Sequence, residues 1–221
     1  MILGPGEYRL DNTRGITIRL RFRKIGPARF LSHLDLVLLF QRAFRRALLP
    51  IAFSMGKVPR PRINIPYPLP LGVETEVDVL EVNLVHEIHL EDVKDRLNDK
   101  LPEGIEVLLI RKALQGERRS LSGLEYSIQG DGLPDCDPVK RILNCTTLKV
   151  ARKRKERLIS VDIRPFVESI QRIDARHMTL TLKVQDGRST RPDEVLDALG
   201  LNADTLAGLH IVRTGIVETV Q

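Results

Sequence analysis

The chain has little aromatic character: it contains no tryptophan, and aromatic residues make up 4% of its 221 residues. Domains that bind single-stranded RNA usually stack bases on exposed aromatic rings. Phe22 falls on the apolar side of a predicted strand, and the aromatic signature of RNA-recognition domains is absent. The composition therefore disfavours a base-stacking platform.

Cysteine is also scarce. Cys136 and Cys145 lie nine positions apart, which matches no metal-binding pattern and is too little for a disulfide scaffold. The first residues lack the features of a secretory signal, and the longest apolar runs, such as 36–40, are too short to span a bilayer. These absences predict a cytoplasmic protein with no membrane association.

Several catalytic motifs are missing. There is no GxxxxGK[ST], no GxGxxG after a strand, no GxSxG and no CxxxCxxC. These absences disfavour nucleotide hydrolysis, a Rossmann cofactor, a hydrolase elbow and iron–sulfur radical chemistry by this chain alone. His86 and His89 are three positions apart at a strand end, where they do not share a face. We therefore expect no metal, no cofactor and no catalytic activity of the chain by itself.

Positive charge, in contrast, is abundant and concentrated. The stretch 14–62 holds twelve lysines and arginines and one acidic residue, Asp35, a local balance of +11 in a chain whose net charge is +6. Like charges held together repel one another, so such asymmetry favours an anionic partner. Nucleic acid is the first expectation and an acidic protein face the second.

Hydrophobic periodicity predicts an α+β fold. The alternation over 16–23 indicates a half-buried strand with arginines on its open face, and Ser32 and Asp35 form a capping pattern for a helix that Pro50 ends. The predicted first domain, 1–115, continues with strands at 51–54, 76–86 and 105–114, a helix at 90–101, and an extended proline-rich loop over 56–72. This is the β-α-β-β-α-β order of ferredoxin-like (split βαβ) domains.

A second domain is predicted over 122–221. Its expected strands are 124–128, 147–153, 157–163, 177–184 and 210–218, and its expected helices are 138–143, 192–199 and 203–206. We predict that it is a distorted second ferredoxin-like domain in tandem with the first. This prediction rests on element order, because no sequence repeat supports it.

The arginines of the first strand allow two interpretations. In the split βαβ topology the first and third strands are neighbours, so Arg19, Arg21 and Arg23 would face Glu76 and Asp78. They would then form cross-strand ion pairs. Otherwise they are free to contact phosphate.

Other cations form three further candidate groups for contacts with nucleic acid. One group lies on or before the helix, one lies in the proline-stiffened loop, and one forms a very basic hairpin. For the loop the alternative is that Glu74 or Glu76 pins it, and for the hairpin the alternative is a solvated tip that keeps the protein soluble. The three groups are Arg29, Arg42, Arg45 and Arg46; Lys57, Arg60 and Arg62; and Lys149, Arg152, Lys153, Arg154, Lys155 and Arg157.

His33 follows the helix cap and is a weak catalytic candidate. It shares a helix face with Val37, Phe40 and Phe44, which favours a half-buried structural histidine. A general acid or base beside a basic surface would suit metal-independent RNA cleavage, but no second catalytic partner is visible.

The phrases FLSHLDL and PLPLGVE, within RLRFRKIGPARFLSHLDLVLLFQRAFRRALLPIAFSMG and PRPRINIPYPLPLGVETEVDVLEVNL, resemble the radical-SAM-linked domain of unknown function. VDIRPFVESI resembles a weaker motif of that family. The likeness is strongest over 17–85. It implies an accessory protein encoded beside, or fused to, a radical S-adenosylmethionine protein. In that family this loop usually reads Gly-Phe, then Asn or His, then Pro. Here residues 56–59 read Gly-Lys-Val-Pro, so Lys57 adds a positive charge.

The favoured hypothesis is an accessory RNA-binding protein that presents tRNA or rRNA to a radical-SAM modification enzyme. Two alternatives remain open. One is a metal-independent endoribonuclease similar to the CRISPR repeat-processing enzymes, although their glycine-rich C-terminal loop is missing. The other is a module that docks on an acidic face of the radical-SAM partner.

Overall fold

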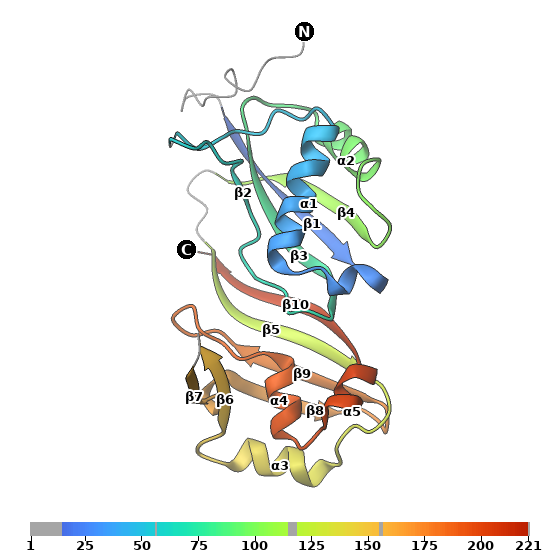
Figure 1. The fold of residues 1–221 in the computed structure, drawn as a ribbon, viewed down its shortest axis with the longest axis vertical. Coiled ribbons are helices and arrows are strands. Elements are labelled where there is room, and N and C mark those ends of the chain that lie inside the picture. Colours follow the sequence, from blue (N-terminus) through green and yellow to red (C-terminus); the bar gives the residue numbers. More distant parts are fainter. Residues whose placement is uncertain (1–14, 56, 115–118, 155–156, 221) are drawn as a thin grey trace. The chain divides into compact units, whose positions relative to one another are not determined.

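The computed structural model describes residues 15–55, 57–114, 119–154 and 157–220, and it has a mixed α+β fold (Figure 1). The chain divides into two compact units, Met1–Glu117 and Arg118–Gln221. Each unit contains four strands that pair antiparallel with one another, together with helices. The α+β class predicted from periodicity is therefore confirmed.

In the first unit, the sheet order is β4-β1-β3, with the short β2 paired to β3. Its elements are β1 (Ile16–Lys24), a 3₁₀ turn (Gly26–Phe30), α1 (His33–Arg46), β2 (Ile63–Asn64), β3 (Val73–Leu84), α2 (Leu90–Asn98) and β4 (Ile105–Lys112). Both helices contribute to one core, in which Phe22 of β1 meets Phe40 of α1 edge to face at a centroid distance of 5.1 Å. Both helices therefore cover the same face of the sheet.

The predicted cap of α1 is confirmed. Ser32 is the N-cap residue, and its Oγ accepts a hydrogen bond from the Asp35 N–H at 3.2 Å while donating to the Asp35 carboxylate at 2.6 Å. The acid also lies in the first turn, where the helix dipole favours negative charge.

The predicted strand at 51–54 and the strandless proline-rich loop are both wrong. Ile51 and Phe53 form only isolated bridges, and the second strand of the unit is β2, inside the proline-rich segment. The segment was predicted as a loop because proline removes ladder donors. Ile63 and Asn64 lie between prolines and are free to pair with β3.

The register between β1 and β3 also differs from the prediction. Arg19 lies opposite Glu81, and Phe22 lies opposite Asp78. A bulge between Phe22 and Lys24 shifts the pairing, and from Asp78 onward the even-numbered residues of β3 point into the core. Asp78 is therefore buried and does not lie across from an arginine of β1.

The C-terminus of α1 contains a strained residue. Leu48 has φ +53° and its side chain is 71% exposed. The N–H of Leu48 bonds to the Arg45 carbonyl and that of Leu49 to the Phe44 carbonyl, which is the Schellman pattern that usually has glycine at this position. From the last turn of α2, Arg96 donates hydrogen bonds to the carbonyls of Ala47 and Leu48.

In the second unit, the sheet order is β10-β5-β9-β8, and β6 and β7 form a separate hairpin. If the hairpin is left aside, the four remaining strands of each unit follow the same order: the fourth strand pairs with the first, the first with the third, and the third with the second. The elements are β5 (Arg119–Gln129), α3 (Cys136–Asn144), β6 (Lys149–Arg154), β7 (Arg157–Asp162), a 3₁₀ turn (Arg164–Phe166), β8 (Val167–Arg172), β9 (His177–Lys183), α4 (Pro192–Ala198), α5 (Ala203–Gly208) and β10 (His210–Val220).

The sequence prediction missed β8. Its pairing with β9 is irregular between Val167 and Ser169, so its buried residues, Val167 and Ile170, are three positions apart instead of two. This spacing hides the strand from a search for strict alternation.

We predict that Leu48→Gly stabilises the protein. A left-handed backbone costs a non-glycine residue about 1–2 kcal/mol, and glycine would remove this strain. The strain exceeds the entropic cost of glycine, so the free energy of unfolding should rise by about 0.5–1 kcal/mol. Thermal and urea denaturation measure this change. The matched control, Leu38→Gly, alters a residue inside α1 and should destabilise by about 1 kcal/mol. A loss of stability in Leu48→Gly would contradict the strain.

Candidate nucleic-acid interface

Two basic residues of the first unit, Arg19 and Lys24, are buried. Arg19 is only 6% exposed, and its Nε lies 3.1 Å from the Glu81 carboxylate. Lys24 is fully buried, and its Nζ donates to the carbonyls of Arg29 and Leu31. Arg19 was predicted to contact nucleic acid, but a buried guanidinium cannot reach phosphate without unfolding the sheet, so we leave it out of the candidate surface.

The other two arginines of β1 differ in their surroundings. Arg23 forms an ion pair with Glu106 of β4 at 2.5 Å, and both side chains are about 40% exposed. Arg21 is exposed and lies between Val79 and Leu109 on the neighbouring strands. The predicted pairing with Glu76 and Asp78 is wrong, although cross-strand pairing does engage Arg19 and Arg23.

Arg29 precedes α1 and is already engaged. Its Nη1 lies 3.8 Å from Glu74, and its guanidinium lies 4.9 Å from the centroid of the Phe30 ring. Glu74 also accepts a hydrogen bond from the Gly26 N–H. Arg29 therefore helps to hold the turn before α1.

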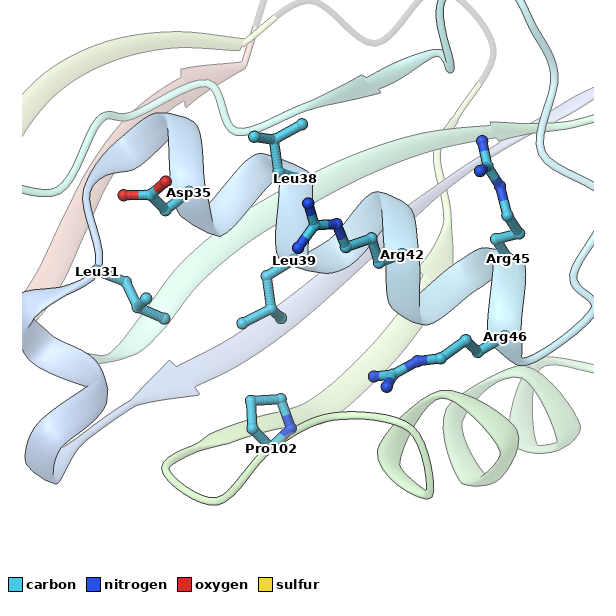
Figure 2. Close-up of a pocket in the computed structure, with 8 residues that line it drawn as sticks. All are labelled: Leu31, Asp35, Leu38, Leu39, Arg42, Arg45, Arg46 and Pro102. Atoms are coloured by element: carbon cyan, nitrogen blue, oxygen red, sulfur yellow. The ribbon is translucent and has the colours of Figure 1, made fainter.

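The arginines of α1 line a groove of about 560 Å³ (Figure 2). Arg42 and Arg45 are exposed, and neither forms an ion pair or side-chain hydrogen bond with any residue that the structure describes. Arg46 donates a hydrogen bond to the Lys100 carbonyl, which joins α1 to the loop after α2. The remaining lining residues are Leu31, Asp35, Leu38, Leu39 and Pro102.

The outer side of α1 carries exposed leucines. Leu34 and Leu38 are 73% and 47% exposed. The buried positions of the helix are Leu36, Phe40, Ala43 and Phe44, which form a narrow stripe. The groove arginines therefore have leucines beside them.

The loop cations lie on a short turn. The Ser54 N–H bonds to the Arg60 carbonyl, the Arg60 N–H bonds to Ser54 Oγ, and the Arg62 N–H bonds to the Ala52 carbonyl. Lys57, Arg60 and Arg62 are all exposed. These backbone bonds hold the turn's base while its basic side chains remain in solvent.

The β6–β7 hairpin is exposed along most of its length. Lys149 and Lys153 are exposed on β6, and Arg157 is exposed on β7. Alternate residues of a strand point to the same face, so Lys149 and Lys153 share one face, about 13 Å apart along the strand. Lys155 lies outside the described residues, and the Arg154 side chain is likewise not described.

Arg152 points the other way and anchors the hairpin. Its Nε and Nη2 each donate to a Glu194 carboxylate oxygen at 2.7 Å, and Nη2 also bonds to the Ser189 carbonyl. Glu194 lies in the first turn of α4 and is 7% exposed. It also accepts hydrogen bonds from Thr190 Oγ1 and the Arg191 N–H. Arg152 thus serves the fold and not the surface.

These contacts set the acidity of Glu194. Burial raises the pKa of the Glu194 carboxyl, but the hydrogen bonds from Arg152, Arg191 and Thr190 outweigh burial and lower the pKa from 4.5 to about 2. The hydrogen bond to Glu194 in turn raises the pKa of Arg152. The pair is therefore ionised throughout the physiological range.

Asp162 and Arg164 fix the base of the hairpin, a role that the sequence analysis did not assign. Asp162 Oδ1 accepts from the Leu148 and Arg164 N–H groups, which lower the pKa of Asp162. The Arg164 guanidinium donates to the carbonyls of Leu143, Cys145 and Val167. The signal was present in the VDIRPF motif, whose acid and arginine flank one isoleucine.

His33 occupies the first position of α1 and is partly buried. Its Nδ1 is buried and has no hydrogen-bond partner among the described residues. The described part of the chain therefore shows no group that orients the His33 ring through this nitrogen, as the partner of a catalytic base does. The same described residues contain no group of three or more His, Cys, Asp or Glu side chains arranged to hold a metal ion.

Comparison with known proteins identifies a family. A family model described as an uncharacterized protein conserved in bacteria, DUF2344, matches residues 17–192. A search of curated proteins finds no match. None of the helices in the described ranges is long and apolar enough to cross a membrane.

Two solved structures show distant likeness. A chain from the crystal structure of a Cbf5-Nop10-Gar1 complex is 12% identical, with a TM-score of 0.41; the match covers 90% of this chain and 48% of that one. A crystal structure of an unknown protein from Galdieria sulphuraria is 12% identical, with a TM-score of 0.28, over 93% of this chain and 99% of that one. The chain thus spans about half the length of the first. We infer no function from either.

We predict that Glu194→Gln destabilises the second unit by about 2 kcal/mol at pH 7, because it leaves Arg152 without its carboxylate. The folded pKa of Glu194 lies below its ordinary value, so its stabilisation is present above pH 4.5 and is lost as the pH falls toward 2. Urea denaturation between pH 7 and pH 2.5 should therefore show the wild-type advantage shrinking below about pH 4.5.

Asp193→Asn provides the control, because Asp193 pairs with Arg191 at an exposed position and acts on Arg152 only through space, without a hydrogen bond. It should change the free energy of unfolding by less than about 0.5 kcal/mol. A wild-type advantage over Glu194→Gln that stays constant down to pH 2.5 would contradict the proposed ionisation.

Proposed function

This chain belongs to the DUF2344 family, and from the placement of its exposed cations we propose that it is an accessory RNA-binding protein. The observation that carries the proposal is the β6–β7 hairpin, which exposes Lys149, Lys153 and Arg157 on a two-stranded ribbon. Neutralising phosphates with such side chains releases counterions and favours binding.

The charges of Lys153 and Arg157 are not needed to hold the hairpin in place. Arg152 and Arg164 make the contacts that attach it to the rest of the unit, through Glu194 and three backbone carbonyls. Lys153 and Arg157 make no ion pair or side-chain hydrogen bond within the described ranges. Their charge therefore remains available for a phosphate backbone.

The loop of the first unit supplies a second set of contacts. Lys57, Arg60 and Arg62 extend from a turn whose backbone bonds and prolines reduce the entropy lost on binding. Arg60 and Arg62 add a planar fork that can grip phosphate with two hydrogen bonds. In this proposal the charge-adding departure at Lys57 strengthens the contact.

The ligand class follows from what the surface lacks. With few aromatic residues in the chain, base stacking contributes little. Folded RNA is recognised instead through phosphates, 2′-hydroxyls and shape. We therefore propose a structured RNA, such as tRNA or rRNA, as the ligand.

Two finer parts of the proposal rest on other grounds. The sequence resemblance to radical-SAM-linked domains supports delivery of the RNA to a radical S-adenosylmethionine enzyme. The shared strand orders, β4-β1-β3-β2 and β10-β5-β9-β8, support the assignment of both units as ferredoxin-like domains, with β6–β7 inserted into the second.

We predict that replacing Lys149, Lys153 and Arg157 with glutamine weakens binding to bulk tRNA at least about tenfold near 100 mM salt. Three lost phosphate contacts should also reduce the slope of log K against log salt by about 2–3. Fluorescence anisotropy between about 50 and 200 mM salt measures both quantities.

The matched control replaces Lys140, Arg141 and Arg188, three exposed cations elsewhere in the second unit. It removes the same net charge and should leave most of the affinity. Equal losses in both triple variants, or no salt-dependent binding by the wild type, would refute the hairpin as the RNA contact.

Intact RNA after incubation with wild type and His33→Ala in EDTA would remove the endoribonuclease alternative.

A further inference from the structure

The groove along α1 differs in character from the hairpin and the loop. Its lining combines three arginines with four apolar residues and one acid (Figure 2). Burying leucine against a phosphate backbone gains little, because the hydrophobic effect requires an apolar partner. This combination therefore suits a ligand that has both apolar and anionic groups.

Charge is arranged unevenly along the groove. Asp35 lies at the N-terminal end of α1, and Arg42, Arg45 and Arg46 lie in its last two turns. The Asp35 carboxylate already accepts a hydrogen bond from the Ser32 hydroxyl, and Arg46 donates a hydrogen bond to the Lys100 carbonyl. Arg42 and Arg45 therefore carry the available charge, and it is positive.

Apolar contacts are available one helical turn from those charges. Leu38 precedes Arg42 by four positions, so the two side chains are neighbours on the helix surface. Leu34 lies one turn further toward the N-terminus and extends the exposed apolar line, while Leu39 and Pro102 contribute to the groove wall. Exposed apolar side chains that gather along one element mark interaction sites.

We propose that this groove binds a short amphipathic acidic helix of a partner protein. The partner's leucine-like side chains contact Leu31, Leu38, Leu39 and Pro102, and its glutamates or aspartates, one turn away, pair with Arg42 and Arg45. Helix-in-groove recognition uses such apolar anchors at intervals of three and four residues. Asp35 at the opposite end disfavours a continuous anion such as RNA and sets the direction of the bound helix, with its acidic end beside Arg42.

The groove geometry is held by contacts that do not involve Leu38 or Arg42. Arg46 joins α1 to the loop that carries Pro102, and Arg96 bonds to the carbonyls at the end of α1. A pre-formed groove loses little conformational freedom on binding. Arg42 and Leu38 can thus be replaced without disturbing the contacts that shape it.

Display selection tests this proposal directly. A library of peptides of about 16 residues, which span about 24 Å as a helix, is selected against the full chain. The expected winners carry Leu, Ile or Phe at intervals of three and four together with Asp or Glu. Their affinity should fall at least about tenfold for Leu38→Gln and for Arg42→Gln, a loss typical of central interface residues.

Matched variants outside the groove are Leu71→Gln, at an exposed leucine, and Lys112→Gln, at a surface cation paired with Glu87. Both should retain peptide affinity, and thermal denaturation confirms that all four variants are folded. A peptide with lysine in place of its acidic residues should fail to bind the wild type but bind Arg42→Glu.

The same variants are also measured for binding to bulk tRNA, the RNA that is used for the hairpin variants. Unchanged RNA affinity in Leu38→Gln and Arg42→Gln supports the proposal. Selected peptides that ignore both substitutions would overturn it. RNA affinity that falls with Arg42→Gln, while selection yields no acidic amphipathic peptide, would reassign the groove to RNA. The hairpin variants are independent of each of these results.

Discussion

The ion pair between Arg152 and Glu194 attaches the most basic segment of the protein, the β6–β7 hairpin, to α4. Glu194 is nearly buried, and a carboxylate in that position must be satisfied by hydrogen bonds. Arg152 supplies two, and Thr190 and the Arg191 N–H supply the others. One side chain therefore both caps α4 and holds the hairpin. Lys153 and Arg157, in contrast, make no ion pair or side-chain hydrogen bond with the residues that the structure describes.

The basic side chains fall into two groups, those bonded to protein carboxylates or carbonyls and those exposed to solvent. Arg19, Arg29, Arg96, Arg152 and Arg164 satisfy carboxylates or backbone carbonyls. Arginine suits this role because its planar fork donates several hydrogen bonds at once. The exposed group contains side chains on turns, on ribbon faces and on the outer side of α1. The local density of charge in the sequence cannot distinguish these two groups. Arg152 and Lys153 are adjacent, yet Arg152 bonds to Glu194 and Lys153 is exposed to solvent.

Periodicity and capping were sufficient to predict most of the elements. The alternation of β1 and the Ser32–Asp35 cap of α1 are local patterns, and both occur in the structure as expected. The failures are not local. The bulge after Phe22 shifts the register with β3, and the irregular pairing at Val167 hides β8. Neither bulge has a local sequence signature, because each depends on the partner strand.

The candidate sites show the same division. Sequence identified the basic loop and hairpin, because clustered charge is visible without a structure. It could not show that Arg19 is buried or that Arg152 faces Glu194, because both facts depend on residues 42 or more positions away. It also could not show that Leu34 and Leu38 are exposed, since a helix with apolar residues on most sides does not reveal which stripe its sheet covers.

The strain at Leu48 connects the fold with the groove. A left-handed leucine persists only where its surroundings impose that backbone, and here the Schellman bonds and Arg96 fix the end of α1. Arg46, one residue before the C-cap, reaches the loop that carries Pro102. The end of the helix is therefore held from two directions, by α2 and by the loop after it. Arg42 and Arg45 lie close to this anchored end of the helix, and in the proposed recognition their spacing from Leu38 would let the groove select a partner by shape as well as by charge.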